Sequence, residues 1–103
     1  MSRREQVLAK ATVESTKNHV VKAVQKHLDD VARSKNYDGI LSLCTYATSL
    51  DPIFSKEGQA GVVFRDDAWR YCYKVLGDVT LGYREMPTIE QLLLELPEMV
   101  WPD

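Results

Sequence analysis

Two cysteines, Cys44 and Cys72, and two histidines, His19 and His27, are the side chains of this sequence best suited to covalent chemistry. A cysteine nucleophile needs a neighbour that stabilises its thiolate and a base such as histidine. His27 could meet either cysteine, but nothing in the spacing requires it. Zinc sites carry close pairs such as CxxC or HxxxH, and these four residues form no such pair. We therefore expect no catalytic residue, no metal site, no cofactor and no enzyme activity, and we interpret the cysteines as small buried hydrophobes.

Charged residues around Arg65 give a second possible source of chemistry. Asp66 and Asp67 lie beside Arg70 on the polar side of a predicted helix, where local salt bridges are a better explanation than an acid/base pair. Arg65 falls within the apolar arc of that helix. Its guanidinium group must therefore find a carboxylate, backbone carbonyls or a partner chain, and an internal ion pair is the favoured interpretation.

Aromatic residues at 69, 71 and 73 could in principle stack on nucleic-acid bases. Basic residues are not interleaved with them, so core packing is the favoured interpretation. Gly58 and Gly61 are isolated on a helix and do not form a phosphate-binding loop.

The helix that carries these residues is predicted to organise the fold. Wound at about 100° per residue, residues 60–76 place their apolar side chains on an arc of roughly 220°, far wider than a surface helix shows. The arc contains Ala60, Val62, Phe64, Ala68, Trp69, Tyr71, Cys72, Tyr73, Val75 and Leu76. We predict a central buried helix over about 57–81, capped by Ser55, with Phe64, Arg65, Trp69, Tyr71 and Cys72 in its core.

Two further helices are predicted before the central one. Residues 16–33 carry an apolar stripe opposite a charged face, and residues 39–48 repeat apolar residues at helical spacing after Asp38, a suitable N-cap. Ile53 and Phe54 are expected to fill the core from a connecting turn. A capping box at Ser2 predicts an additional N-terminal helix, with a break or bend near residues 12–15; the alternative is one bent helix that continues into the next.

The C-terminal part contains clear local signals. Gly82 is expected to end the central helix in the left-handed conformation. Thr88 and Gln91 have the spacing of a capping box that starts a short last helix, and Pro97 should end it, leaving an extended tail. The fold class is therefore all-α, a small bundle of four to five helices around a central buried helix (about 57–81) with an extended C-terminal tail. We divide the chain into an N-terminal basic arm or short helix (1–15) and a single helical domain (16–103).

Charge and hydropathy limit the functional classes. The net charge is −2, but residues 1–26 hold six Lys/Arg and two Glu, so this segment is basic and the remainder is acidic. No apolar run has the length of a membrane span or a secretory signal, so we expect a cytosolic protein with no membrane partner. The basic segment is interpreted as a solvated helix face or, alternatively, as an arm that meets an acidic partner.

Several segments, taken in order, resemble a family of small proteins and C-terminal domains encoded in tailed-bacteriophage tail and tail-fibre gene clusters. The segments are HLDDVA (27–32), NYDGILSLCTY (36–46), EGQA (57–60), RDDAW (65–69) and MPTIEQLLLELP (86–97). The resemblance covers roughly residues 20–101. It implies a non-enzymatic virion tail component, or a helper in tail-fibre attachment and assembly, and it supplies no catalytic or ligand-binding residues.

The predicted function is therefore a phage tail or tail-fibre structural or assembly protein. It would bind other tail proteins, act in multiple copies, and occupy the host cytoplasm during assembly and then the virion tail. The alternatives are an assembly chaperone absent from the mature virion and a small DNA-binding regulator, although the acidic remainder argues against nucleic acid. The predicted partner-binding residues lie in the arm and the tail: Arg3, Arg4, Val7, Leu8, Met99 and Trp101.

Overall fold

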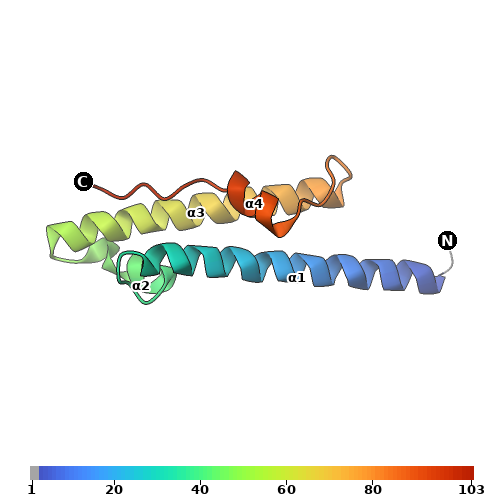
Figure 1. Ribbon diagram of the computed structural model, residues 1–103, viewed down its shortest axis with the longest axis horizontal. Helices are drawn as coiled ribbons and strands as arrows, with labels where there is room; N and C mark the ends of the chain where they lie inside the picture. Colours follow the sequence, from blue (N-terminus) through green and yellow to red (C-terminus); the bar gives the residue numbers. More distant parts are fainter. Residues whose placement is uncertain (1–2) are drawn as a thin grey trace.

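The structure is a computed structural model that describes the backbone of residues 3–103 and the side chains of residues 15–103. It contains four α-helices and one short 3-10 helix, and no strand occurs in the described part (Figure 1). The elements are α1 (Arg3–Arg33), α2 (Ile40–Thr45), η1 (Tyr46–Thr48), α3 (Pro52–Thr80) and α4 (Ile89–Glu95). The prediction of an all-α fold is confirmed.

The architecture is a long antiparallel pair of helices that carries the shorter elements. Figure 1 shows α1 and α3 side by side along the long axis, with α2 at the end where they are connected. The molecule measures 60 × 22 × 21 Å. Helix α3 packs against α1, α2 and η1, while α4 packs on α1. None of the described helices is both long and apolar enough to span a membrane.

A single hydrophobic core runs along the seam between these elements. Its members on α1 recur every four residues, as the apolar stripe of 16–33 predicted. Among residues 15–103 the buried apolar side chains are Val20, Val24, Leu28, Ala32, Ile40, Leu43, Phe64, Ala68, Cys72, Val75, Leu76, Leu92 and Leu96.

The buried stripe of α3 is narrower than its apolar pattern predicted. Phe64 and Cys72 are buried, but Trp69 and Tyr71 are only partly buried. Tyr73 is 59% exposed, so its predicted place in the apolar arc of the core is wrong. The reason is that α3 lies beside one long helix and several short elements, which together cover only part of its circumference.

Helix α3 begins earlier than predicted. Asp51 is the N-cap: its Oδ1 accepts hydrogen bonds from the backbone nitrogens of Ile53 (2.9 Å) and Phe54 (3.1 Å), and Pro52 occupies the first turn. The prediction of Ser55 as the cap is therefore wrong. Ile53 and Phe54 lie in the first helical turn and are exposed, Ile53 by 68%, so they do not fill the core as predicted.

The predicted end of α3 is confirmed. Gly82 has φ 81°, and the backbone nitrogen of Tyr83 donates to the carbonyl of Asp78 at 2.8 Å. These are the features of a Schellman motif, in which a residue in the left-handed conformation lets the chain satisfy the last helical carbonyls. Asn36, with φ 70°, takes the same position after α1.

The start of α4 also agrees with the sequence. The backbone nitrogen of Gln91 donates to Oγ1 of Thr88 at 3.1 Å, and the backbone nitrogen of Thr88 donates to Oε1 of Gln91 at 3.0 Å. The predicted capping box is therefore confirmed. Beyond Leu96 the chain leaves the helix without forming another element.

The predicted break near residues 12–15 is wrong, because α1 is one helix from Arg3 to Arg33. Residues with β-branched or small polar side chains lower helix propensity by only fractions of a kcal/mol each, roughly 0.7 at most, and this does not interrupt a long helix. The predicted capping box at Ser2 and the side chains of Arg3, Arg4, Val7 and Leu8 lie outside the described residues.

The cap of α2 comes from a distant residue. Gly39 occupies the N-cap position, and the backbone nitrogen of Ile40 donates to Oδ1 of Asp29 in α1 at 2.9 Å. The prediction that Asp38 caps a helix over 39–48 is therefore wrong. The helical segment instead divides into α2 and the 3-10 turn η1.

Candidate functional site

An apolar groove lies between α1 and the C-terminal part of α3. It has a volume of about 430 Å³. Two residues of α1 and five from the C-terminal part of α3 and its cap line it: Lys17, Val21, Tyr73, Leu76, Gly77, Thr80 and Leu81. Tyr73 and Leu81 are 59% and 66% exposed, so the groove opens directly to solvent.

Helix geometry places this groove on the side of α3 that faces away from α4. Tyr71 points toward α4, because its hydroxyl donates a 2.5 Å hydrogen bond to Oε1 of Glu95. Tyr73 is two residues further along α3 and therefore projects about 200° away from Tyr71. The ring of Tyr73 stacks on Trp69, with 5.7 Å between the ring centroids and 27° between the planes.

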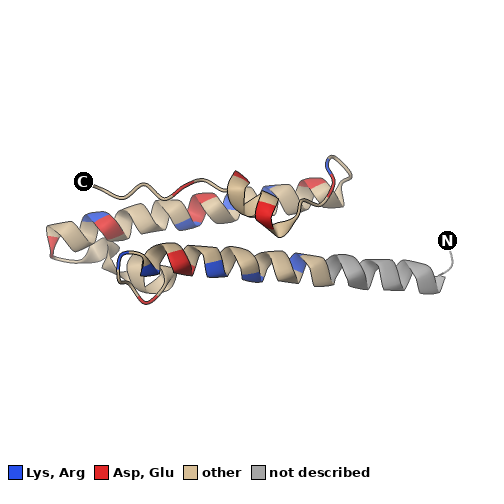
Figure 2. Cartoon of the chain, viewed as in Figure 1, with Lys and Arg blue, Asp and Glu red and all other residues tan. Residues whose placement is uncertain are grey.

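Lys17 closes one side of the groove. Its Nζ donates to Oγ1 of Thr80 at 2.8 Å and joins α1 to α3. Among the described residues, Lys17 takes part in no salt bridge. Figure 2 marks further basic positions along the described part of α1, and both basic and acidic positions on α3.

On the opposite side, a cluster of three side chains holds α4 in place. Glu95 accepts the Tyr71 hydrogen bond and two more from the Arg84 guanidinium group, at 2.9 Å to Oε1 and 3.1 Å to Oε2. Arg84, followed by Tyr71, lowers the pKa of Glu95 to about 2. The hydrogen bond to Glu95 raises the pKa of Tyr71. The cluster links α3, the loop after it and α4.

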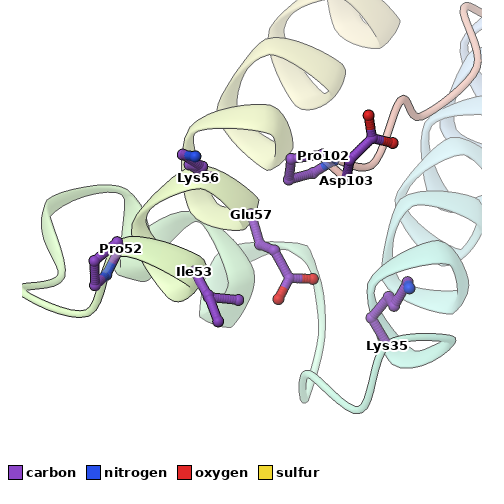
Figure 3. Close-up of a pocket in the computed structure, with 7 residues that line it drawn as sticks. All are labelled: Lys35, Pro52, Ile53, Lys56, Glu57, Pro102 and Asp103. Atoms are coloured by element: carbon purple, nitrogen blue, oxygen red, sulfur yellow. The ribbon is translucent and has the colours of Figure 1, made fainter.

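The two predicted partner-binding residues of the tail lie against the protein itself. Met99 and Trp101 are partly buried and pack against the core. Nζ of Lys35 lies 5.7 Å from the Trp101 ring centroid, within the range of a cation–π contact. Figure 3 shows residues that line a hollow of about 270 Å³ at this end of the molecule, among them Lys35, Lys56, Glu57, Pro102 and Asp103.

The cysteines do not have the properties of a reactive thiolate. Cys72 is buried, and burial raises the pKa of its thiol. Burial also raises the pKa of Cys44, and this effect outweighs the opposing effect of the nearby Arg65. Of the histidines, His27 makes an edge contact with Phe64, with 6.3 Å between ring centroids, and His19 is exposed. No group of three potential metal ligands occurs among the described residues.

Arg65 finds its partner next to it in the sequence. Its Nε and Nη2 donate to Oδ1 of Asp66 at 3.1 and 3.0 Å, and the hydrogen bond to Asp66 raises the pKa of Arg65. The Arg65 side chain is 36% exposed, so the pair lies at the surface and not within the core. Arg70 pairs with Asp67 at 3.3 Å, a local salt bridge of the kind that the sequence predicted.

The sequence did not indicate the groove. Tyr73 was assigned to the core, and Leu81 and Val21 were not singled out as surface residues. The available signal was that Tyr71 and Tyr73 project in nearly opposite directions, so that one short helix cannot cover both. Comparisons of the chain with protein-family models, with curated proteins and with solved structures found no match to any of them.

Proposed function

We propose that this protein is an interaction module that connects, or assists the assembly of, bacteriophage tail or tail-fibre components, in the host cytoplasm and then in the virion tail. The resemblance of its segments to proteins of tail gene clusters supports the biological setting. The groove between α1 and α3 supports the mode of action and is the observation that carries the proposal.

The groove has the chemistry of a protein-binding surface. Tyr73, whose ring stacks on Trp69, lines the groove; the rest of the lining is mostly apolar, and one lysine lies at the rim. Aromatic residues are enriched at the centres of protein interfaces, where they supply a large contact area at low entropic cost. Two antiparallel helices with an apolar channel between them suit an amphipathic helix of a partner, laid into the groove.

A photo-crosslinking amino acid at Tyr73 tests this proposal. In cells that produce the tail proteins, crosslinks from position 73 should join the chain to a tail or tail-fibre protein. The matched control is Leu50, which is 101% exposed but lies in the connection before α3. Equal crosslinking from both positions, or none from position 73, would contradict a role for the groove.

Mass spectrometry of purified virions separates the two forms of the proposal. Detection of the chain at a fixed ratio to known tail proteins indicates a permanent component. Crosslinking to a tail protein during assembly, followed by absence from the virion, indicates the chaperone alternative. Salt-dependent binding to plain duplex DNA, without a tail partner, would instead favour the regulator.

A further inference from the structure

Helix α4 presents one side to solvent. Leu92 is buried against the core, whereas Leu94 is 87% exposed. Leu94 lies two residues after Leu92 and therefore projects about 200° away from it, away from the core. Glu90 is one turn before Leu94 on the same side of the helix and is also exposed. We call this side, with Glu90 and Leu94, the outward face of α4.

The outward face combines one apolar side chain with one carboxylate. Helix α4 has the sequence IEQLLLE and contains no basic residue. Among the described residues, Glu90 takes part in no salt bridge. The face therefore suits a surface that offers an apolar hollow and, one helical turn away, a single positive charge.

The groove between α1 and α3 offers this combination. Of the described residues that line it, Lys17 alone is charged. Gly77 lies in the lining and leaves a space, because a Cβ atom added there would meet nothing within 4 Å. Nζ of Lys17 lies 2.8 Å from Oγ1 of Thr80, three residues beyond Gly77. A leucine could therefore enter at Gly77 while a carboxylate reaches Lys17.

The dimensions of the two surfaces agree. At a rise of about 1.5 Å per residue, Gly77 and Thr80 are about 4.5 Å apart along α3, and Glu90 and Leu94 are about 6 Å apart along α4. The groove extends along α3 from residue 73 to residue 81, about 12 Å, and the seven residues of α4 span about 10 Å. One α4 helix thus fits the length of the groove.

The groove and the outward face lie on opposite sides of the molecule. The groove is on the side of α3 that faces away from α4, because Tyr73 lines it while Tyr71 is bonded to Glu95 of α4. A chain therefore cannot place its α4 in its own groove, and two chains cannot fill each other's grooves at the same time. A contact between the two surfaces is heterologous and repeats from copy to copy.

We propose that the groove binds the outward face of α4 of a second copy, with Leu94 in the space at Gly77 and Glu90 at Lys17, so that copies associate head to tail. This inference rests on the proposed role of the groove as a protein-binding surface, and it names one occupant. A two-turn helix buries less than the roughly 800 Å² per partner of a standard interface, so each contact is weak. The last copy of a row keeps an open groove, which a tail protein can bind.

Two variants test the contact by complementation. Leu94→Arg changes the outward face and Leu81→Glu changes the groove; both positions are exposed, so both chains should keep their fold, which circular dichroism verifies. In sedimentation velocity, the wild-type protein should form species larger than a dimer as its concentration rises. Each variant alone should remain monomeric. Their equimolar mixture should form a heterodimer that does not grow, because only one groove and one outward face are intact.

Leu50→Arg is the matched control, because Leu50 is fully exposed but lies outside both surfaces, and it should associate as the wild type does. Glu90→Lys should weaken association several-fold, and Lys17→Glu in the same chain should restore it. The proposal would be overturned by a wild-type protein that stays monomeric or stops at a dimer, by a mixture without heterodimer, or by a charge exchange without recovery.

These results can be separated from a failure of the proposed function. The Leu94→Arg chain keeps its groove, so crosslinks from position 73 to a tail protein should persist in this background. If they persist while the wild-type protein never associates with itself, only the head-to-tail contact is wrong. If the wild-type protein associates as expected but no tail protein is crosslinked, only the proposed function is wrong.

Discussion

A Cβ atom added to Gly58 would lie only 2.2 Å from the backbone nitrogen of Ala47. Helix α3 and η1 therefore meet backbone to backbone at this glycine. One turn later, a Cβ at Gly61 would lie 2.6 Å from the Leu43 side chain. Two glycines three residues apart thus let the connection between α1 and α3 fold tightly against α3, which positions the two long helices that form the groove.

Gly58→Ala should destabilise the protein. Because the clash is with backbone atoms, α3 and η1 must move apart, and overpacking of this kind costs about 1–3 kcal/mol. Gly77→Ala is the matched control: Gly77 is also in α3, but a Cβ there meets nothing within 4 Å. That change should stabilise the helix by up to about 1 kcal/mol, because alanine has the higher helix propensity. Urea unfolding of both variants measures the difference, and equal effects would contradict the close contact.

Asp29→Ala should remove the cap of α2. Oδ1 of Asp29 accepts the hydrogen bond of the first free backbone N–H of this helix, and loss of an N-cap acceptor costs about 1 kcal/mol. Asp29→Asn keeps an acceptor oxygen and should restore most of the stability. Asp38→Ala, at the exposed position that the sequence favoured, should change the free energy of unfolding by no more than about 0.5 kcal/mol. Thermal or urea unfolding of the three variants provides the test.

The contacts of Gly58 and Asp29 could not be predicted from the sequence, whereas two other local features could. Gly82 and the pair Thr88–Gln91 were predicted correctly because each signal is complete within a few residues. The cap from Asp29 joins residues 11 positions apart, and the contact at Gly58 joins two separate elements. Neither contact leaves a local pattern, because a backbone N–H or a missing Cβ does not specify which distant segment will approach it.

The start of α3 was missed for a different reason. Asp51 and Pro52 are a recognisable cap and first-turn pair, but the cap was expected at Ser55, four residues later. Because α3 starts at Pro52, Ile53 lies in its first turn and not in a connecting turn, and its side chain is exposed. At the candidate site, the apolar residues of α3 have the helical spacing that was predicted. The sequence of α3 alone does not show how many other elements cover it, and so it did not predict that Tyr73 is exposed.

The stability of the protein should fall in acid through Glu95. Its pKa in the folded state is about 2, below the ordinary value of 4.5, so the carboxylate contributes stability above pH 4.5. This contribution is lost progressively as the pH falls from about 4.5 toward 2. Glu95→Gln lacks the titrating group and should show a flatter dependence of stability on pH in this range. The free energy of unfolding is measured for both proteins from pH 6 to pH 2. The same dependence on pH in both would contradict the role of the cluster.

Removal of residues 1–15 should leave a folded domain but abolish assembly with a tail partner. Val20, Val24, Leu28 and Ala32 lie beyond the cut, so the truncated helix keeps these four buried residues of α1. The cut falls within α1, and the shortened helix should therefore begin to fray near residue 16. Circular dichroism and urea unfolding measure the fold, and co-purification with the tail partner measures assembly. A complex that persists with the truncated chain would argue against the basic arm as a contact element.

The cysteines provide a direct comparison between the interaction module and an enzyme. Because burial raises the pKa of both thiols, Cys44 should react with a thiol reagent at pH 7 more slowly than free glutathione does. Cys72, which is fully buried, should react only at the rate at which the protein opens, and faster in urea. Cys44→Ser and Cys72→Ala assign the two rates. A cysteine that reacts faster than glutathione in the folded protein would indicate a stabilised thiolate and would favour an enzyme over the interaction module.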